Sequence, residues 1–276
     1  MTLPRCPSSP PIVGRPSARE ADTWPALQRD TARDLWRFSA VLALISTGLA
    51  MFDGLAAGYA MKAIAIQVVV AAVVGCALRS AGATAHPHPR FGPANRVTLT
   101  RLTLATLLAA LCGPAAGPPV ALSLASDSVR WAVVAAATLA ALLDAVDGPL
   151  ARRSGLASAF GARFDMETDA WFTLVLCALV LQAGQAGPWV LASGLMRYAF
   201  VGAMRPWPWL AAPLPPSRRR QAVCVVQITA LIVCLGPIVP PAWAHALAAA
   251  SLALLTVSFA IDVHTLARAR RHPLEV

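Results

Sequence analysis

The chain alternates long apolar runs with shorter polar and basic segments. A helix that crosses a bilayer needs about 20 mostly apolar residues, and eight runs approach that length. Two lie early in the chain, at roughly 36–52 and 56–78. Six more follow, at roughly 97–117, 129–149, 166–184, 187–204, 221–238 and 242–264. The pattern predicts an all-α polytopic membrane protein with a six-helix core and two extra N-terminal transmembrane helices.

The segments between the apolar runs divide the chain into five parts. Residues 1–34 are rich in Pro, Ser, Arg and Asp, have no apolar stretch typical of a signal peptide, and are expected to form a disordered cytoplasmic tail. The two-helix extension covers 35–80, and a linker with helix-stopping Pro and Gly covers 81–94. The core covers 95–267, and a basic C-terminal tail covers 268–276.

Composition and charge agree with this assignment. The chain is 57% hydrophobic and 13% charged, whereas about a quarter of the residues in soluble domains are charged. Its net charge of +10 comes from arginines that gather in every second loop, with Arg130 the one arginine of the opposite loops. The positive-inside rule explains this distribution without a nucleic-acid partner and places both chain ends in the cytoplasm. We expect an integral protein of a bacterial inner membrane, with 144–169 at the cytoplasmic face.

One stretch, DAVDGPLARRSGLASAFGARFDMETD at 144–169, places four aspartates close together. Asp144 and Asp147 are three residues apart and share one helix face, and Asp165 and Asp169 are four apart and share another. Pro149 is expected to kink or end the first helix, and a short link then turns the chain back. Two neighbouring helix ends can thus direct two aspartates each at a common point.

Four carboxylates that converge without a counter-charge repel one another. Divalent cations remove that repulsion, and oxygen ligands without Cys or His favour Mg²⁺ or Mn²⁺ over zinc. Gly148 and Ala151 keep the helix face slim enough for a ligand to approach, and Arg152 beside them can pair with phosphate. The alternative is that the aspartates are solvated charges at helix ends, which the regular spacing disfavours.

This stretch resembles the signature of the CDP-alcohol phosphatidyltransferase family, D-x2-D-G-x2-A-R-x8-G-x3-D-x3-D. All eight fixed positions are filled without insertion, by Asp144, Asp147, Gly148, Ala151, Arg152, Gly161, Asp165 and Asp169. The family also has a P-N-x-L-T-x-x-R pattern at its first core helix, which ANRVTLTR at 94–101 matches at Asn95, Thr98 and Arg101. The resemblance covers about 95–265 and leaves the N-terminal extension outside.

The resemblance implies a reaction in which a CDP-activated lipid, usually CDP-diacylglycerol, gives its phosphatidyl group to an alcohol and CMP leaves. It implies that Asp144, Asp147 and Asp165 are metal ligands, and that Asp169 completes the metal cluster and acts as general base on the alcohol. The implied CDP site consists of Asn95, Thr98, Gly148, Ala151, Arg152 and Gly161. Two cations can clamp a pyrophosphate and stabilise the leaving group. The resemblance is also compatible with a homodimer.

Arginines outside this stretch are candidates for binding the acceptor alcohol. Arg197 lies in an apolar run, where a charge needs a partner, either a buried carboxylate or a polar or phosphate group of the acceptor. Arg218, Arg219 and Arg220 open the next helix on the side of the aspartates. They are either a positive-inside anchor or a site for a phosphorylated acceptor.

Two other functions use acidic residues in membranes. Membrane prenyltransferases bind diphosphate through magnesium and Asp-rich motifs, but on well-separated helices and without the D-G-x2-A-R core. A transporter of ions or phosphate, which is not an enzyme, needs acidic residues deep in several helices, whereas the predicted spans have almost none outside 144–169. The sequence therefore favours a magnesium-dependent phosphotransferase of phospholipid biosynthesis, and it does not identify the alcohol.

Overall fold

The computed structural model describes residues 18–52, 57–113, 126–215 and 217–271, and all regular structure in these ranges is helical. The N-terminal pair is α1 (Ala18–Phe52) and α2 (Ala57–Ala85). The core helices are α3 (Pro93–Ala109), α5 (Asp127–Ser154), α6 (Ala159–Gln182), α7 (Leu191–Ala203), α8 (Arg218–Leu235) and α9 (Pro241–Arg271). Two short 3-10 helices, η1 (Pro188–Val190) and η2 (Pro208–Ala211), flank α7. The predicted all-α fold is confirmed.

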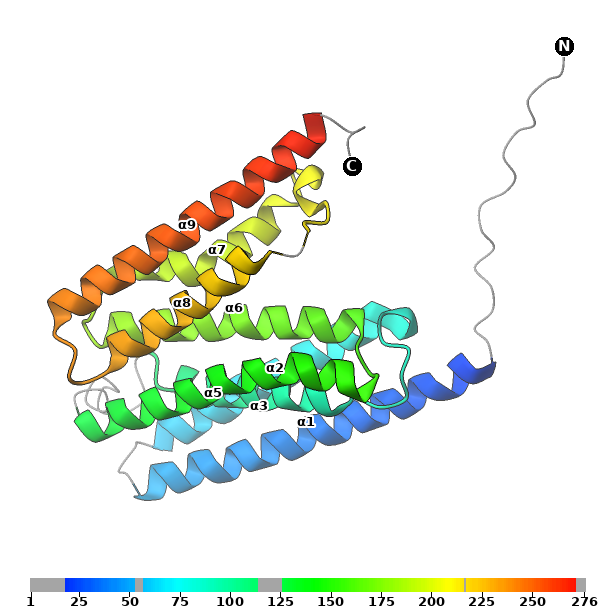
Figure 1. Cartoon of the computed structure of the whole chain (residues 1–276). Helices are drawn as coiled ribbons and strands as arrows, with labels where there is room; N and C mark the ends of the chain where they lie inside the picture. Colours follow the sequence, from blue (N-terminus) through cyan, green and yellow to red (C-terminus); the bar gives the residue numbers. More distant parts are fainter. Residues whose placement is uncertain (1–17, 53–56, 114–125, 216, 272–276) are drawn as a thin grey trace, which may run out of the picture.

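Successive helices run in opposite directions along the bundle, so the start of α1 and the end of α9 lie at the same end (Figure 1). α1 packs on α2, and both contact α3. α3 packs against α5 and α6, while α8 packs against α5, α6 and α9. The link between α5 and α6 runs only from Gly155 to Ser158, and Gly155 ends α5 with a left-handed φ of 67°. This short link brings the end of α5 next to the start of α6.

The expected disordered tail at 1–34 is wrong for residues 18–34, which belong to α1. Residues 1–17 lie outside the described ranges. Leu27 in this segment and Leu35 just after it are buried on one face of α1, whereas Arg29 and Arg33 on the other face are exposed. The high polar content therefore belongs to the solvated face of an amphipathic helix.

Two further boundaries differ from the sequence-based expectation. Pro149 neither ends α5 nor starts a link, because the helix continues through it to Ser154. A proline removes one helix hydrogen bond, and Arg152 and Arg153 in the last turn stabilise the helix C-terminus. The linker expected at 81–94 is shorter, since α2 continues to Ala85 with a kink at Gly82 and α3 begins at Pro93.

Four of the described helices are long and apolar enough to cross a bilayer, within Trp24–Met51, Gly58–Ala85, Asp127–Ser154 and Pro241–Arg270. Large apolar side chains on them point outward, among them Leu44, Val68 and Trp243, which are at least 60% exposed. Surfaces of this kind face lipid rather than water. α3 and α7 have 17 and 13 residues, fewer than the other core helices. The chain is an integral membrane protein.

Two clusters of buried apolar side chains hold the bundle together. The larger one joins the core helices through residues such as Leu176, Leu179 and Leu231. The smaller one lies at the end of the bundle where α5 meets α6 and contains Leu27, Leu35, Val74, Leu78, Phe91, Leu99, Leu102, Phe160 and Phe164. This Phe91 cluster ties α1 and α2 to the beginnings of α3 and α6.

Candidate active site

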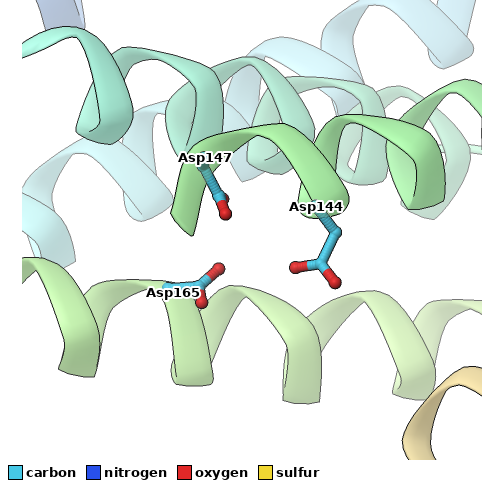
Figure 2. Close-up of side chains that lie close together, drawn as sticks. All are labelled: Asp144, Asp147 and Asp165. Atoms are coloured by element: carbon cyan, nitrogen blue, oxygen red, sulfur yellow. The ribbon is translucent and has the colours of Figure 1, made fainter. Parts of the chain in front are cut away.

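The aspartates of 144–169 come together between α5 and α6. One carboxylate oxygen each of Asp144, Asp147 and Asp165 lies within 4.8 Å of the other two. Figure 2 shows these three side chains pointing toward one another, two from α5 and one from α6. Asp169, one turn further along α6, joins them through an ion pair with Arg101. We call these four residues the aspartate cluster.

Arg101 of α3 lies at the centre of the aspartate cluster. Its side chain is only 2% exposed, and all three nitrogens of its guanidinium donate hydrogen bonds. Nε donates to the carbonyl oxygen of Ala140 at 3.2 Å. Nη1 donates to Asp147 at 3.0 Å and to Asp165 at 2.7 Å. Nη2 donates to Asp169 and forms an ion pair with Asp144 at 2.8 Å. One buried cation thus holds four like charges together.

The four carboxylates differ in how far they are open to a ligand. The Asp147 side chain is 7% exposed and also accepts a hydrogen bond from Thr98 Oγ1 at 3.2 Å. The side chains of Asp144, Asp165 and Asp169 are 36%, 35% and 37% exposed. Asp147 is therefore fixed by its neighbours, whereas the other three keep surface that a ligand can reach.

The charge distribution between loops does not predict that Arg101 lies in the site. By the positive-inside rule, Arg101 is only one of the arginines that anchor a helix start at the membrane surface. The sequence nevertheless contains a signal for this role, because Arg101 follows Asn95 and Thr98 inside an apolar helix. A charge at that depth in a membrane helix needs a partner of opposite charge. The four converging aspartates are the carboxylates that could provide it.

A cavity of about 230 Å³ adjoins the aspartate cluster, lined by the start of α3, the end of α5 and the start of α6. All the residues that the resemblance assigned to a CDP site line it, namely Asn95, Thr98, Gly148, Ala151, Arg152 and Gly161. Asp147 and Asp165 line it as well, whereas Asp144 and Asp169 are not among its lining residues. The aspartate cluster therefore has one side that faces this α3–α5–α6 cavity and one that does not.

Close packing shapes the cavity wall at Gly161. A Cβ at this position would lie 2.8 Å from Asn95 Oδ1 and 3.2 Å from Ser158 Oγ, so a larger residue would push Asn95 away. Asn95 is itself held, because its Nδ2 donates to the carbonyl oxygen of Phe91 at 2.6 Å. At Gly148, by contrast, a Cβ would meet only Arg152 Nη1 at 3.6 Å. Gly161 thus permits close packing of α6 on α3, and Gly148 leaves room in the cavity.

A chain of hydrogen bonds fixes the start of α6 beside the cavity. The Gly161 N–H donates to the N-cap oxygen, Ser158 Oγ, at 3.0 Å. Ser158 Oγ lies 2.6 Å from His86 Nδ1, and His86 Nε2 lies 2.9 Å from the carbonyl oxygen of Arg90. Because a carbonyl only accepts, Nε2 carries the hydrogen and Nδ1 accepts from Ser158. Burial lowers the pKa of His86 below its usual value, which favours this neutral form.

Arg197, a candidate for acceptor binding, is paired with a carboxylate. Its Nη2 donates to Glu167 Oε1 at 2.7 Å, and both side chains are partly exposed. Glu167 lies on α6 between Asp165 and Asp169 but belongs to a different face. Of the two alternatives for Arg197, the ion pair is therefore the one seen in the structure, although its carboxylate is not buried.

The other acceptor candidates, Arg218, Arg219 and Arg220, lie in the first turn of α8. Arg219 donates to the hydroxyl and carbonyl oxygens of Ser258, both at 2.6 Å, and pairs with Asp262. Arg220 lies 3.4 Å from Asp262, and Arg218 is exposed. These arginines join α8 to α9, and the structure does not pair them with the aspartate cluster.

The aspartate cluster fits a hard divalent cation. It offers carboxylate oxygens alone, and Mg–O bonds of about 2.1 Å place neighbouring ligand oxygens roughly 3–4 Å apart. The 4.8 Å within which three of the oxygens lie requires only a small contraction. Four carboxylates against one guanidinium leave three negative charges in excess. Cations are therefore the ligands that this site can accommodate.

A model of the CDP-alcohol phosphatidyltransferase family matches residues 91–261 of the chain. The match includes the aspartate cluster, Arg101 and the whole lining of the α3–α5–α6 cavity. It covers more than half of the 276 residues and leaves α1 and α2 outside. No curated protein and no solved structure is similar enough to the chain to count as a match.

Replacing Arg101 with Gln is expected to destabilise the protein most strongly when divalent cations are absent. The substitution removes the counter-charge, and breaking a buried ion pair costs about 3 kcal/mol or more. For a chain of this size the melting temperature in EDTA should fall by roughly 6–12 °C, and Mg²⁺ should restore most of the loss. Thermal unfolding of the detergent-solubilised protein in EDTA and in Mg²⁺ measures both effects.

Arg130→Gln is the matched control for this experiment. Arg130 donates to the carbonyl oxygens of Leu235 and Gly236 at 3.1 and 3.0 Å, and the described residues give it no carboxylate partner. Its loss should lower the melting temperature equally in EDTA and in Mg²⁺. If Arg101→Gln unfolds like the wild type in EDTA, Arg101 does not hold the aspartate cluster together.

Proposed function

Because the chain belongs to the CDP-alcohol phosphatidyltransferase family, we propose that it transfers a phosphatidyl group from CDP-diacylglycerol to an alcohol and releases CMP. The family determines the reaction class, which is phosphatidyl transfer from a CDP-alcohol by a membrane protein. The choice of CDP-diacylglycerol as donor and the roles of the individual residues are the proposal.

One observation supports the proposal most directly: the α3–α5–α6 cavity meets the aspartate cluster at Asp147 and Asp165. A CDP group in this cavity would have its pyrophosphate beside those carboxylates and the guanidinium of Arg152. Arg152 can form charge-assisted hydrogen bonds with phosphate. The lack of a side chain at Gly148 leaves room in the cavity for a nucleotide, whereas Gly161 lets α6 pack closely against Asn95.

The metal ligands of the proposed enzyme are Asp144, Asp147 and Asp165, with Asp169 completing the set. These residues would hold Mg²⁺ or Mn²⁺ ions, two by analogy with other phosphoryl-transfer sites, which would supply positive charge to the pyrophosphate and to the leaving CMP. Side chains of the protein hold these carboxylates in position. Arg101 and Thr98 fix Asp147 through hydrogen bonds of 3.0 and 3.2 Å, and Arg101 restrains the rest of the cluster.

Asp169 is the proposed general base. It belongs to the aspartate cluster but does not line the α3–α5–α6 cavity, so an alcohol can reach it from the side opposite CDP. The alcohol oxygen forms a bond to the phosphorus of the phosphatidyl group, the bond from that phosphorus to the CMP oxygen breaks, and the alcohol proton moves to Asp169. This arrangement suits an in-line displacement.

Arg197, Arg218, Arg219 and Arg220 are proposed to contact the acceptor. Glu167 and Asp262 pair with three of them, so an anionic acceptor would have to compete with these carboxylates. Arg218 is exposed and needs no such exchange. A comparison of phosphorylated with neutral alcohols as substrates tests this assignment.

The two alternative functions are less well supported. A prenyltransferase would need two separate Asp-rich motifs, whereas the aspartate cluster comes from two adjacent helices joined by the short link Gly155–Ser158. A transporter would need carboxylates along a path through the bundle, and Asp144, Asp147, Asp165 and Asp169 instead gather in the halves of α5 and α6 next to their link. The family match favours the phosphotransferase over both.

Asp169→Asn is expected to abolish turnover while CDP-lipid binding stays largely intact. An amide has the shape of the carboxylate but cannot accept the proton, and loss of a general base typically lowers the rate by about 10²–10⁴-fold. Asp144→Asn should weaken Mg²⁺-dependent binding as well as turnover, because it removes a metal ligand. CMP release and CDP binding by the purified protein measure the two effects separately.

Two results would contradict these roles. Near-wild-type turnover of Asp169→Asn at saturating alcohol would show that another group accepts the proton. Equal loss of CDP binding in Asp169→Asn and Asp144→Asn would instead make Asp169 a fourth metal ligand without a base function.

The active site is proposed to face the cytoplasm, because the basic segments that contain Arg152, Arg163 and Arg218 lie at the end of the bundle with the aspartate cluster. A cysteine at Ser154, in a chain without its native cysteines, should be protected from a membrane-impermeant reagent in intact cells. A cysteine at Ser126, at the opposite end of α5, should react. Labelling of Ser154→Cys before the membrane is permeabilised would reverse the orientation.

A further inference from the structure

Helix α1 lies outside the family match, yet it contacts residues that line the α3–α5–α6 cavity. We propose that Asp30 and Asp34 of α1 are positioning residues, which hold the segment 91–96 in the conformation that binds CDP. The inference rests on the proposed function, because it takes the cavity to be the CDP site.

The two carboxylates reach this segment directly. Asp30 Oδ2 accepts a hydrogen bond from the Phe91 N–H at 2.9 Å. Asp34 Oδ2 accepts one from Arg96 Nε at 2.6 Å, and Arg96 Nη2 lies 3.5 Å from Asp30. The Asp34 side chain is only 4% exposed, and burial of a carboxylate is costly unless it is paired. Arg37 on the same helix lies further away, at 3.9 Å, so Arg96 is the main partner of Asp34.

Asp30 also supports the start of α3 through its charge. The N-cap residue of α3, Gly92, makes no hydrogen bond with a side chain, and the first N–H groups of a helix have no partner within it. Asp30 binds the N–H of the preceding residue, Phe91. A carboxylate at this place also interacts favourably with the positive end of the helix dipole. α1 therefore supplies the negative group that the sequence at 91–96 lacks.

The segment held by α1 is part of the cavity wall. Phe91 and Gly92 line the cavity together with Asn95. The carbonyl oxygen of Phe91 accepts the Asn95 Nδ2 hydrogen bond of 2.6 Å, and Asn95 Oδ1 in turn lies against Gly161. A shift of Phe91 would therefore move Asn95, which is one of the residues proposed to bind CDP.

The apolar contacts of α1 make a test by substitution practical. Leu27 and Leu35 lie on the same face as Asp30 and Asp34 and belong to the Phe91 cluster. They remain when a carboxylate is replaced by an amide, so α1 should stay docked on α3. What changes is the charge-assisted hydrogen bonding to 91–96, which fixes the position of the wall.

The test uses the purified full-length protein with CDP, CDP-diacylglycerol and Mg²⁺. Asp30→Asn and Asp34→Asn are each expected to raise the Kd for CDP and the KM for CDP-diacylglycerol on the order of tenfold. The KM for the alcohol and the dependence on Mg²⁺ should stay within about twofold of the wild type, because neither site contacts α1. Asp34→Glu keeps the carboxylate and should recover most of the CDP affinity.

Asp127→Asn is the matched control, since it makes the same chemical change at an exposed position at the far end of α5. It should leave both constants unchanged. The side chain of Asp30 is more exposed than that of Asp34. If Asp34→Asn does not fold, the CDP affinity of Asp30→Asn therefore tests the inference.

Three outcomes would count against the inference. Wild-type CDP affinity in the variants that fold would overturn it. A parallel rise in the KM for the alcohol, with a lower melting temperature, would make α1 a general support of the fold and would overturn it as well. A wild-type protein that does not bind CDP in Mg²⁺ would refute the proposed function itself.

Discussion

Four carboxylates meet at one point of a largely apolar bundle, and their mutual repulsion has to be balanced before the helices can pack. Arg101 provides the balancing charge from within the chain, with hydrogen bonds or ion pairs to all four aspartates. Because α3 carries Arg101 while α5 and α6 carry the aspartates, the packing of these helices and the geometry of the site depend on the same contacts. One guanidinium does not balance four ionised carboxylates, so the cluster could hold a metal ion. The structure therefore links the stability of the core to the occupancy of its proposed active site.

The two sides of the aspartate cluster have different surroundings, which the proposed function assigns to the nucleotide and to the alcohol. On one side, the α3–α5–α6 cavity is shaped by close packing at Gly161 and by open space at Gly148. On the other side, which is the side proposed for the alcohol, Asp144 and Asp169 lie outside the cavity lining. The start of α6 is fixed through Ser158 and His86, and the start of α3 through α1. The N-terminal extension, which the family match does not include, thus becomes part of the proposed nucleotide site.

Local sequence predicted the parts of this site that depend on helical periodicity. The spacing of Asp144, Asp147, Asp165 and Asp169 fixed which faces they share, and the short link made their convergence predictable. Contacts between helices distant in sequence were not predictable in this way. Arg101 reaches the aspartates only because α3 packs against both α5 and α6, and Asp30 lies 61 residues before its partner Phe91. The helix at 18–34 was missed because its average composition resembles a disordered tail, whereas its buried face appears only when α1 docks on its neighbours.

Catalysis by the aspartate cluster, as proposed, transfers a phosphatidyl group from a CDP-activated lipid to an alcohol and depends on cations. The most direct measurement incubates the purified protein with CDP-diacylglycerol, Mg²⁺ and a panel of neutral and phosphorylated alcohols, and follows CMP release and new phospholipids by mass spectrometry. We expect one CMP to be released for each phospholipid formed with the accepted alcohol, and both products to be lost in EDTA. Failure to consume CDP-diacylglycerol with any alcohol, or product formation unaffected by EDTA, would contradict it.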